Sequence, residues 1–457
     1  MNTKIKFIAM LAILIFGIIT NAGANISSVD YLHKTILNQK NILVPIGDGV
    51  NSESVHSVKY MMTQIDSANK LLNGFASSNY AAGANIGSIV ATTKVESAVS
   101  ELIKKESQGF SLQLTNTDTF VFTISARGNF SIDWGDGVID KVNKQDVTNT
   151  TYTHNYANSG NYTVSISGLA TEYSTLGLTA AISFSSSSDS AEKITGISGS
   201  LSAIFPTLVN GANPRFASTF NGCTGLTGSI PPDLFSGLSG APVTSMFRNT
   251  FYDCSGLTGE IPPSLFGNIS GAPASNMFQS TFNGCSGLRG SIPSGLFGNL
   301  SGAPTIHMFS STFFACTGLT GEIPSGLFGN ISGAPASNMF HNTFFGCTGL
   351  TGEIPSGLFG NLSGAPAISM FNGTFSDCSG LESFGDGIWD LTSVDNSNVA
   401  QLFMDFCSNC SKITSKSPSI APGSNVKLWQ HFTNSSSKAF IGATNLADYA
   451  DIPAAWK

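Results

Sequence analysis

The chain has 457 residues, enough for two or more structural units, and 41% of them are hydrophobic. Only 11% are Asp, Glu, Lys or Arg, against a usual share of about 25%, and the formal net charge is −7. A surface with so little charge, and that mostly negative, cannot neutralise many phosphates. Nucleic acid and anionic lipid are therefore excluded as partners.

The first 24 residues have the pattern of a secretory signal peptide. Lys4 and Lys6 precede an apolar run over 7–19, and 22–24 form a small-residue cleavage site. The alternative, an uncleaved membrane anchor, is disfavoured because a span needs about 20 apolar residues. We therefore expect a protein that is secreted or held at the cell surface, with no transmembrane span after cleavage.

Residues 25–110 predict a leader of short helices and irregular chain. Apolar residues recur at near-helical spacing in 56–72 and in 93–105, and Gly-, Ala- and Ser-rich sequence lies between them. The leader has no recognisable chemical motif.

Residues 111–175 predict a small β-sandwich. Apolar residues alternate with polar ones in 130–134 and 162–166, and in 120–124 Phe and Ile alternate with Val and Thr, which is the period of half-buried strands. Asp133 and Asp136 lie at a glycine-rich turn, where they can accept backbone hydrogen bonds. Calcium ligation is the alternative, but calcium requires six to eight oxygen ligands.

This region resembles the PKD (polycystic kidney disease) family. The matching phrases are Trp134 to Gly137 (WGDG), His154 to Tyr156 (HNY) and Gly160 to Val164 (GNYTV). The resemblance implies an immunoglobulin-like sandwich with Trp134 in its core.

A 31-residue phrase repeats through residues 190–415. Six cysteines mark it at intervals of 31, and a fixed period of this length is typical of a solenoid in which each repeat forms one coil. Solenoids present extended surfaces that usually bind other molecules.

Within a repeat, apolar positions recur while positions 248, 249, 252 and 253 vary. We interpret the recurring residues as the inside of each coil and the variable ones as exposed columns, although such columns can also drift without selection. The candidate ligand-binding residues are Arg248, Asn249, Tyr252, Gln279, Asn283, Phe314, His341 and Phe345.

The cysteines predict a ladder of buried free thiols. Eight cysteines in an exported protein normally form disulfides, but equivalent side chains in stacked coils point the same way about 4.8 Å apart, which does not suit a disulfide. Cys407 and Cys410 are the exception most able to pair, and a lone C-x-x-C is weak support for zinc. The predicted ladder consists of Cys223, Cys254, Cys285, Cys316, Cys347, Cys378 and Cys410.

The ends of the array depart from the repeat, as capping segments must. Residues 416–457 predict a C-terminal cap that lays Phe440, Leu446 and Trp456 over the open core.

The repeats also resemble a known family. Phe251, Cys254 and Leu257, followed by an Ile-Pro corner, are similar to the leucine-rich repeats of BspA-type bacterial surface proteins, and 257–262 (LTGEIP) is similar to plant extracellular repeats. The period of 31 exceeds the usual 20–29, which leaves the strand register within each coil open. The resemblance implies a secreted or cell-surface binding protein with adhesive or host-contact roles.

No catalytic, metal or cofactor motif emerges from the sequence. The six histidines are scattered, and Glu260, Glu322 and Glu353 share a slot that Ser fills in other repeats, which indicates an exposed corner instead of a carboxylate pair. We therefore expect a non-enzyme without cofactor or metal, and a monomer. Asn-x-Ser triplets recur in the repeats, and we expect them to carry no glycan because the family resemblance is bacterial.

The predicted fold is mainly β: a leucine-rich-repeat-like solenoid of 31-residue coils, preceded by a small immunoglobulin-like (PKD-like) β-sandwich and a short helical leader. Three functions stay open: binding of an extracellular protein on host or neighbouring cells, binding of a glycan there, or a structural spacer without a specific ligand.

Overall fold

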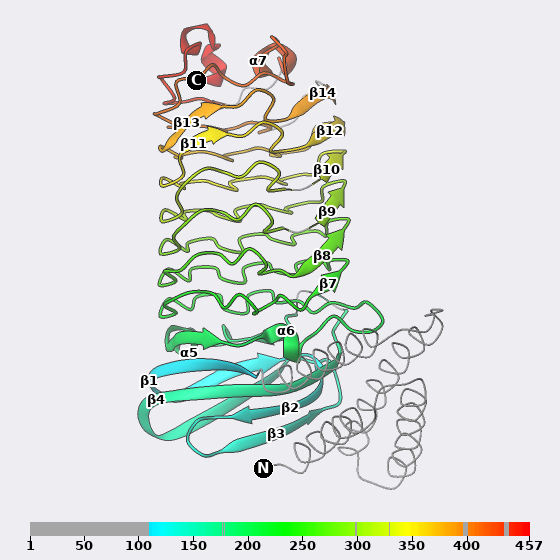
Figure 1. Cartoon of the computed structure of the whole chain (residues 1–457), viewed down its shortest axis with the longest axis vertical. Helices are drawn as coiled ribbons and strands as arrows, with labels where there is room; N and C mark the ends of the chain where they lie inside the picture. The colour runs from blue at the N-terminus through cyan, green and yellow to red at the C-terminus, as the bar shows by residue number, and fades with distance from the viewer. Residues whose placement is uncertain are drawn as a thin grey trace, which may run out of the picture. The chain divides into compact units, whose positions relative to one another are not determined.

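The computed structural model describes residues 109–457 apart from 176, 178, 298, 329, 396–400 and 434–437. This part of the protein is mainly β, with a few short helices (Figure 1). The predicted signal peptide, and the predicted leader up to residue 108, lie outside the described residues. Residues 108–457 form one compact unit.

A six-stranded antiparallel sheet opens the described chain. Its order is β3-β2-β4-β1-β5, and β6 also pairs with β1. Alternate residues of β1 and β2 are buried, which confirms the predicted alternation in these two segments. The strands are β1 (Phe110–Ile124), β2 (Arg127–Asp133), β3 (Ile139–Lys144), β4 (Thr150–Glu172), β5 (Ile182–Ser183) and β6 (Ile194–Ser198).

The sheet differs from the predicted sandwich, because its strands belong to one hydrogen-bonded sheet instead of two facing ones. Its apolar face continues into the repeats. The ring of Phe110 stacks on Phe184 at 5.5 Å, and Phe184 stacks on Phe220 at 5.4 Å. The predicted boundary at 175–190 therefore does not separate two cores.

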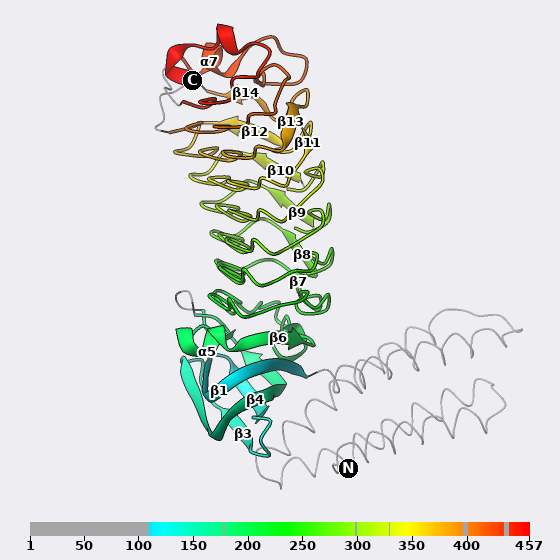
Figure 2. The ribbon, with the colours of Figure 1, turned by 90° about the vertical axis from the view of Figure 1, so that its left-hand side faces the viewer.

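The 31-residue segments that follow lie one above the next (Figures 1 and 2). Short parallel strands pair from segment to segment in the order β14-β12-β10-β9-β8-β7, and β11 pairs with β13. The strands are β7 (Ser239–Gly240), β8 (Asn268–Gly271), β9 (Asn299–Gly302), β10 (Asn330–Gly333), β11 (Gly352–Ile354), β12 (Asn361–Gly364), β13 (Leu381–Phe384) and β14 (Asp390–Val394). The helices are α5 (Ser188–Glu192), α6 (Leu201–Ile204), α7 (Leu428–His431), η1 (Tyr449–Asp451) and η2 (Ala454–Trp456).

A second part of each segment is a run of consecutive turns. We call residues 245–254, 276–285, 307–316, 338–347 and 369–378 the turn runs. Alternate N–H groups donate to the next run, as from Phe247 to the Met277 carbonyl (2.9 Å) and from Phe251 to the Thr281 carbonyl (2.9 Å). The intervening N–H groups donate three residues back, as from Thr250 to the Phe247 carbonyl (3.3 Å). In the four runs from 245 to 347, every amide thus has a partner without a regular strand.

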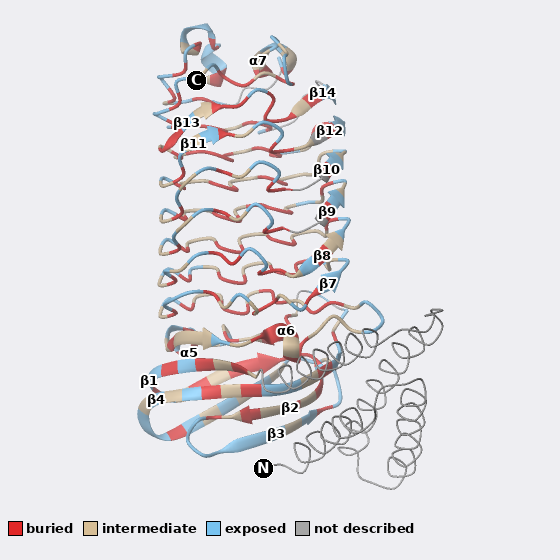
Figure 3. Cartoon of the chain, in the orientation of Figure 1, coloured by how far each residue is buried: buried red, intermediate tan, exposed pale blue. Residues whose placement is uncertain are grey.

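Buried residues recur in every segment of the stack (Figure 3). Phe309, in the middle, contacts four other phenylalanine rings, at 4.6 to 5.8 Å between centroids. The positions that recur as Met, Phe, Cys, Leu and Ile in the sequence are buried in each segment, which confirms that they form the inside.

At its first end, the stack continues the hydrogen bonds of the sheet. Ser125, just after β1, donates to the Ala181 carbonyl (3.0 Å), Ala181 donates to Arg215 (2.8 Å), and Phe216 donates to Met246 (2.7 Å). The sheet therefore supplies the first partner for the run-to-run hydrogen bonds.

At its other end, the stack is closed by η2. Lys438 donates to the Ala455 carbonyl (3.0 Å) and Phe440 donates to the Trp456 carbonyl (2.9 Å). Phe440, Leu446 and Trp456, the residues expected over the open core, are all buried.

Candidate functional site

The candidate ligand-binding residues project from the turn runs. In the first run Met246, Phe247 and Thr250 are fully buried, whereas Arg248 and Tyr252 are partly accessible. The run-to-run hydrogen bonds keep equivalent positions in register, so side chains 31 residues apart form columns.

The candidates, which we expected in exposed columns, are half-buried. The reason is that neighbours within a column cover one another. The rings of Phe314 and Phe345 lie 4.8 Å apart with an interplanar angle of 8°. The half-buried candidates are Arg248, Asn249, Tyr252, Gln279, Asn283, Phe314, His341 and Phe345.

Backbone conformation explains part of the variation that the sequence suggested was functional. Ser245, Asn249 and Asp253 have φ angles of 59°, 55° and 55°, so every fourth residue of the run is left-handed. Asn, Asp and Gly accept this region most easily. The column that contains Asn249 continues as Ser280, Ser311, Asn342 and Gly373, all with φ between 54° and 60°. The left-handed backbone therefore explains why Asn occurs at position 249. This structural cause weakens the assignment of Asn249 as a ligand contact.

Arg248, His307 and His341 are the basic side chains of the turn runs; we call them the Arg–His file. Burial, followed by the nearby Arg248 charge, lowers the pKa of His307. Burial, followed by His307, lowers the pKa of His341. His307 was absent from the sequence-based candidates, although its place at a position equivalent to Ser245 was visible in the repeat.

A second ladder, of threonines, was missed from the sequence. Thr312 is fully buried, and its hydroxyl lies 3.0 Å from the carbonyl oxygen of Phe278 and 2.8 Å from that of Phe309. The hydroxyl thereby ties one run to the next. These threonines recur every 31 residues, which could have marked them as a repeated structural position. A polar residue type, however, does not predict a place in the core. The ladder comprises Thr219, Thr250, Thr281, Thr312, Thr343 and Thr374, all fully buried.

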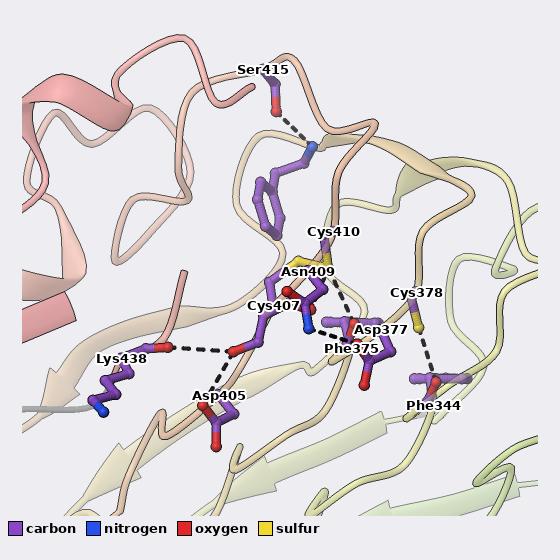
Figure 4. The surroundings of a disulfide bond; sticks show 12 residues. Phe344, Phe375, Asp377, Cys378, Asp405, Cys407, Asn409, Cys410, Ser415 and Lys438 are labelled. Atoms are coloured by element: carbon purple, nitrogen blue, oxygen red, sulfur yellow. Dashed lines mark hydrogen bonds between the residues drawn. A yellow bond between two sulfur atoms is a disulfide. The ribbon is translucent and has the colours of Figure 1, made fainter. Parts of the chain in front are cut away.

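The thiol ladder is present for six cysteines, which are buried and free. Each thiol from Cys254 onward donates to a phenylalanine carbonyl of the preceding segment, as from Cys316 to Phe282 (3.0 Å) and from Cys378 to Phe344 (2.9 Å; Figure 4). Burial raises the pKa of Cys347 to about 12. Burial also raises the pKa values of Cys254, Cys285, Cys316 and Cys378.

Cys410 does not belong to the free-thiol ladder, because it is disulfide-bonded to Cys407 (Figure 4). Its Sγ lies 3.1 Å from the Phe375 carbonyl oxygen, the same kind of neighbour that the free thiols have, but a disulfide sulfur has no proton to donate. In the last segment Ala443 takes the cysteine slot: it donates to Phe440 (3.1 Å), three residues back, as Cys378 donates to Phe375 (3.1 Å).

The two aspartates of the WGDG phrase stabilise its turn. Asp133 accepts the Gly135 N–H (3.0 Å) and Asp136 accepts the Val138 N–H (3.0 Å). The turn-forming role is confirmed for both carboxylates.

The same phrase anchors a small aromatic cluster. The Trp134 ring stacks on His154 at 4.8 Å, and the Tyr156 hydroxyl donates to the Trp134 carbonyl (2.9 Å). His154 Nε2 lies 2.7 Å from Asp136 Oδ2, and this hydrogen bond lowers the pKa of Asp136. Trp134 is buried, as expected. The cluster has the character of a structural support for the sheet.

No metal-binding group of three or more His, Cys, Asp or Glu side chains occurs within the described part of 109–457. The helices in that same part are all too short or too polar to span a membrane. Comparisons with known proteins found no matching family model, no similar curated protein and no similar solved structure.

Proposed function

We propose that this is an exported, non-catalytic surface protein that binds proteins on host or neighbouring cells through a repeat solenoid. The solenoid is proposed to be leucine-rich-repeat-like, of the BspA type, with 31-residue coils. The parallel pairing of β7 to β12 and the repeated hydrogen bonds between turn runs support this fold.

The observation that carries the proposal is the register of the columns. A rigid backbone, held by the buried Thr and Cys ladders, presents half-buried side chains that differ from segment to segment. Repeat proteins use such a framework with variable positions to form extended binding surfaces. Tyrosine and arginine, the types of Tyr252 and Arg248, are enriched among the residues that contribute most to protein interfaces.

Two further parts of the proposal rest on the sequence. Export depends on the signal-peptide pattern of residues 1–24, and the PKD-like assignment depends on the WGDG phrase and the aromatic cluster around Trp134. We propose that the β1–β6 sheet acts as the first cap of the solenoid and that the protein is monomeric, without a cofactor.

A cell-binding experiment tests the proposal. Fluorescently labelled protein is titrated onto cells and extracellular matrix, and saturable binding is expected. The Phe314→Ala, Phe345→Ala double variant should lose most of it. Val138→Ala with Ile139→Ala, which removes exposed apolar side chains from the sheet region, is the matched control and should bind normally. Absence of saturable binding would leave only the structural-spacer function.

A second candidate, glycan binding, is favoured by one observation. The parallel rings of Phe314 and Phe345 offer a flat apolar surface of the kind that sugar rings stack on, beside the amide of Asn283 in the same column. Binding to a glycan array that is lost in the same double variant would favour this candidate over a protein ligand.

A further inference from the structure

Four buried polar side-chain atoms have no hydrogen-bond partner in the described chain, and all four belong to residues in a turn run or within two residues of its beginning. They are Ser245 Oγ, Arg248 Nε, Thr305 Oγ1 and His307 Nδ1. Buried polar atoms in folded proteins nearly always have a partner. These atoms have almost no contact with solvent, so the fold itself leaves polar groups of Arg248 and His307 without hydrogen bonds near the beginning of the turn runs of two segments.

The run-to-run register brings these groups together with His341. The backbone N–H of Arg248 donates to the Ser245 carbonyl (3.2 Å), so the two residues flank one turn. His307 occupies the Ser245 position two segments later, and His341 occupies the Arg248 position three segments later. Neighbouring segments are about 4.8 Å apart, so an arginine side chain can extend toward His307. The electrostatic effect of Arg248 on His307, and of His307 on His341, agrees with this proximity.

Among the residues that the structure describes, no acidic side chain forms an ion pair with the Arg–His file. None of the ion pairs within the described residues includes Arg248. The two carboxylates of the turn runs are Asp253 and Asp377, each at the last residue with a positive φ in its run. Burial raises the pKa of Asp253, and the Arg248 charge does not contribute to that shift. Apart from the thiols, the titratable side chains of the turn runs are Arg248, Tyr252, Asp253, His307, His341 and Asp377.

A half-buried cation without a partner is costly, and a bound anion would remove that cost. A guanidinium is also the side chain best suited to a carboxylate or sulfate, because its donors form a fork. The columns beside the file contain Phe314 and Phe345, the latter only four residues after His341 in the same run. The basic side chains of the Arg–His file and the flat apolar rings of Phe314 and Phe345 thus belong to neighbouring columns.

We propose that the Arg–His file binds the acidic groups of an anionic polysaccharide whose sugar rings stack on Phe314 and Phe345. This inference rests on the glycan candidate above and names its ligand class. The aromatic pair favours a polysaccharide over an acidic peptide.

Binding should strengthen as the pH falls. Both imidazoles have lowered pKa values and are uncharged at neutral pH in the free protein. An anion favours their protonated forms, so its affinity gains from protonation below about pH 6.5, the ordinary histidine pKa.

The test uses the full chain and a matched pair of probes: oligogalacturonate, and the same oligosaccharide fully methyl-esterified and therefore neutral. Calorimetry should show binding of the acid that is roughly tenfold tighter at pH 5.5 than at pH 7.5, and at least roughly tenfold weaker binding of the ester, because each charge-assisted contact contributes on that order. Arg248→Gln should weaken binding of the acid by a similar factor. Arg289→Gln, at an exposed arginine outside the turn runs, should leave it unchanged.

Proton NMR of the wild-type histidines makes the test independent of how the variants fold. Oligogalacturonate should raise the pKa values of His307 and His341. Equal binding of acid and ester would overturn this inference while leaving the glycan candidate standing. Binding of neither oligosaccharide, without histidine shifts, or Arg248-dependent binding of a polyglutamate peptide instead, would overturn the polysaccharide ligand.

Discussion

The middle of the stack and its two ends continue the same run-to-run hydrogen bonds with different segments. In the middle, each turn run donates to the next through repeated bonds such as Phe313 to Thr343 (2.9 Å). At the first end the donor is Ser125, just after β1, and at the last end the acceptor is η2. In the middle, each segment must therefore fit an identical neighbour, which explains why its residues repeat. Each end must fit a different neighbour and has its own sequence.

The cysteine slot shows the same contrast. In the middle the slot is a thiol that donates to the preceding segment, while the two last segments place a disulfide and Ala443 there. A buried thiol stabilises the fold where a carbonyl accepts its hydrogen bond and neighbouring side chains pack around it. Near the end of the stack these conditions differ, so other residues can occupy the cysteine position. The following experiments test how far the middle and the ends differ.

The largest expected effect is alkaline destabilisation that originates in the middle. Five thiols with raised pKa values keep their protons in the folded protein while the unfolded chain ionises near pH 8.5. Their contribution is complete below that pH and is lost as the pH rises toward the folded pKa, by about 1.4 kcal/mol per thiol and pH unit. Reversible urea unfolding between pH 7 and 10 measures it. The Cys316→Ala, Cys347→Ala variant should show a shallower pH dependence, and an unchanged slope would contradict the shared thiol environment.

The next largest effect is the loss of stability on removing a phenylalanine ring, which should differ between the middle of the stack and its end. Phe309→Ala removes a ring that contacts four others and should lower the free energy of unfolding by about 3–5 kcal/mol. Phe440→Ala removes a ring close to the end, whose ring neighbours are Phe384, Phe406 and Trp429, so its effect should be concentrated in residues 384–457. Hydrogen exchange with peptide resolution distinguishes them. Equal loss of protection throughout the stack in both variants would refute the comparison.

The smallest effect concerns the threonine ladder. Thr312→Val keeps the shape but removes one of the two threonine hydroxyls beside each of the Phe278 and Phe309 carbonyls. The hydroxyls of Thr281 and Thr343 remain, so we expect a loss of about 0.5–1.5 kcal/mol of stability. Thr320→Val, at an exposed position of the same segment, serves as control and should stay within about 0.5 kcal/mol of the wild type. Equal denaturation midpoints for both variants would mean that the ladder contributes nothing.

The inside of each segment was predictable because an apolar residue that recurs every 31 positions has one explanation. Phe251, Cys254 and Leu257 were assigned to the core on this basis and are fully buried. The threonines were not assigned, because hydroxyl groups favour the surface unless a carbonyl is placed beside them, and that placement depends on the fold.

The candidate site was only partly predictable. Variation at Arg248 and Phe314 correctly marked accessible columns, but variation at Asn249 reflected a left-handed backbone that sequence spacing does not reveal. His307 was overlooked since its electrostatic neighbours come from other segments. The single sheet was missed because its pairing depends on the long strands β1 and β4 and on where the repeats attach.

The central claim, that successive 31-residue segments lie one above another, is tested most directly by distances between spin labels. Ser229→Cys is paired in turn with Glu260→Cys, Glu322→Cys and Glu353→Cys, all at exposed positions, while the native free thiols are buried. The account predicts distances that grow by roughly 5 Å per segment, to about 5, 15 and 20 Å. Distances that do not increase with the number of segments between the labels would contradict it.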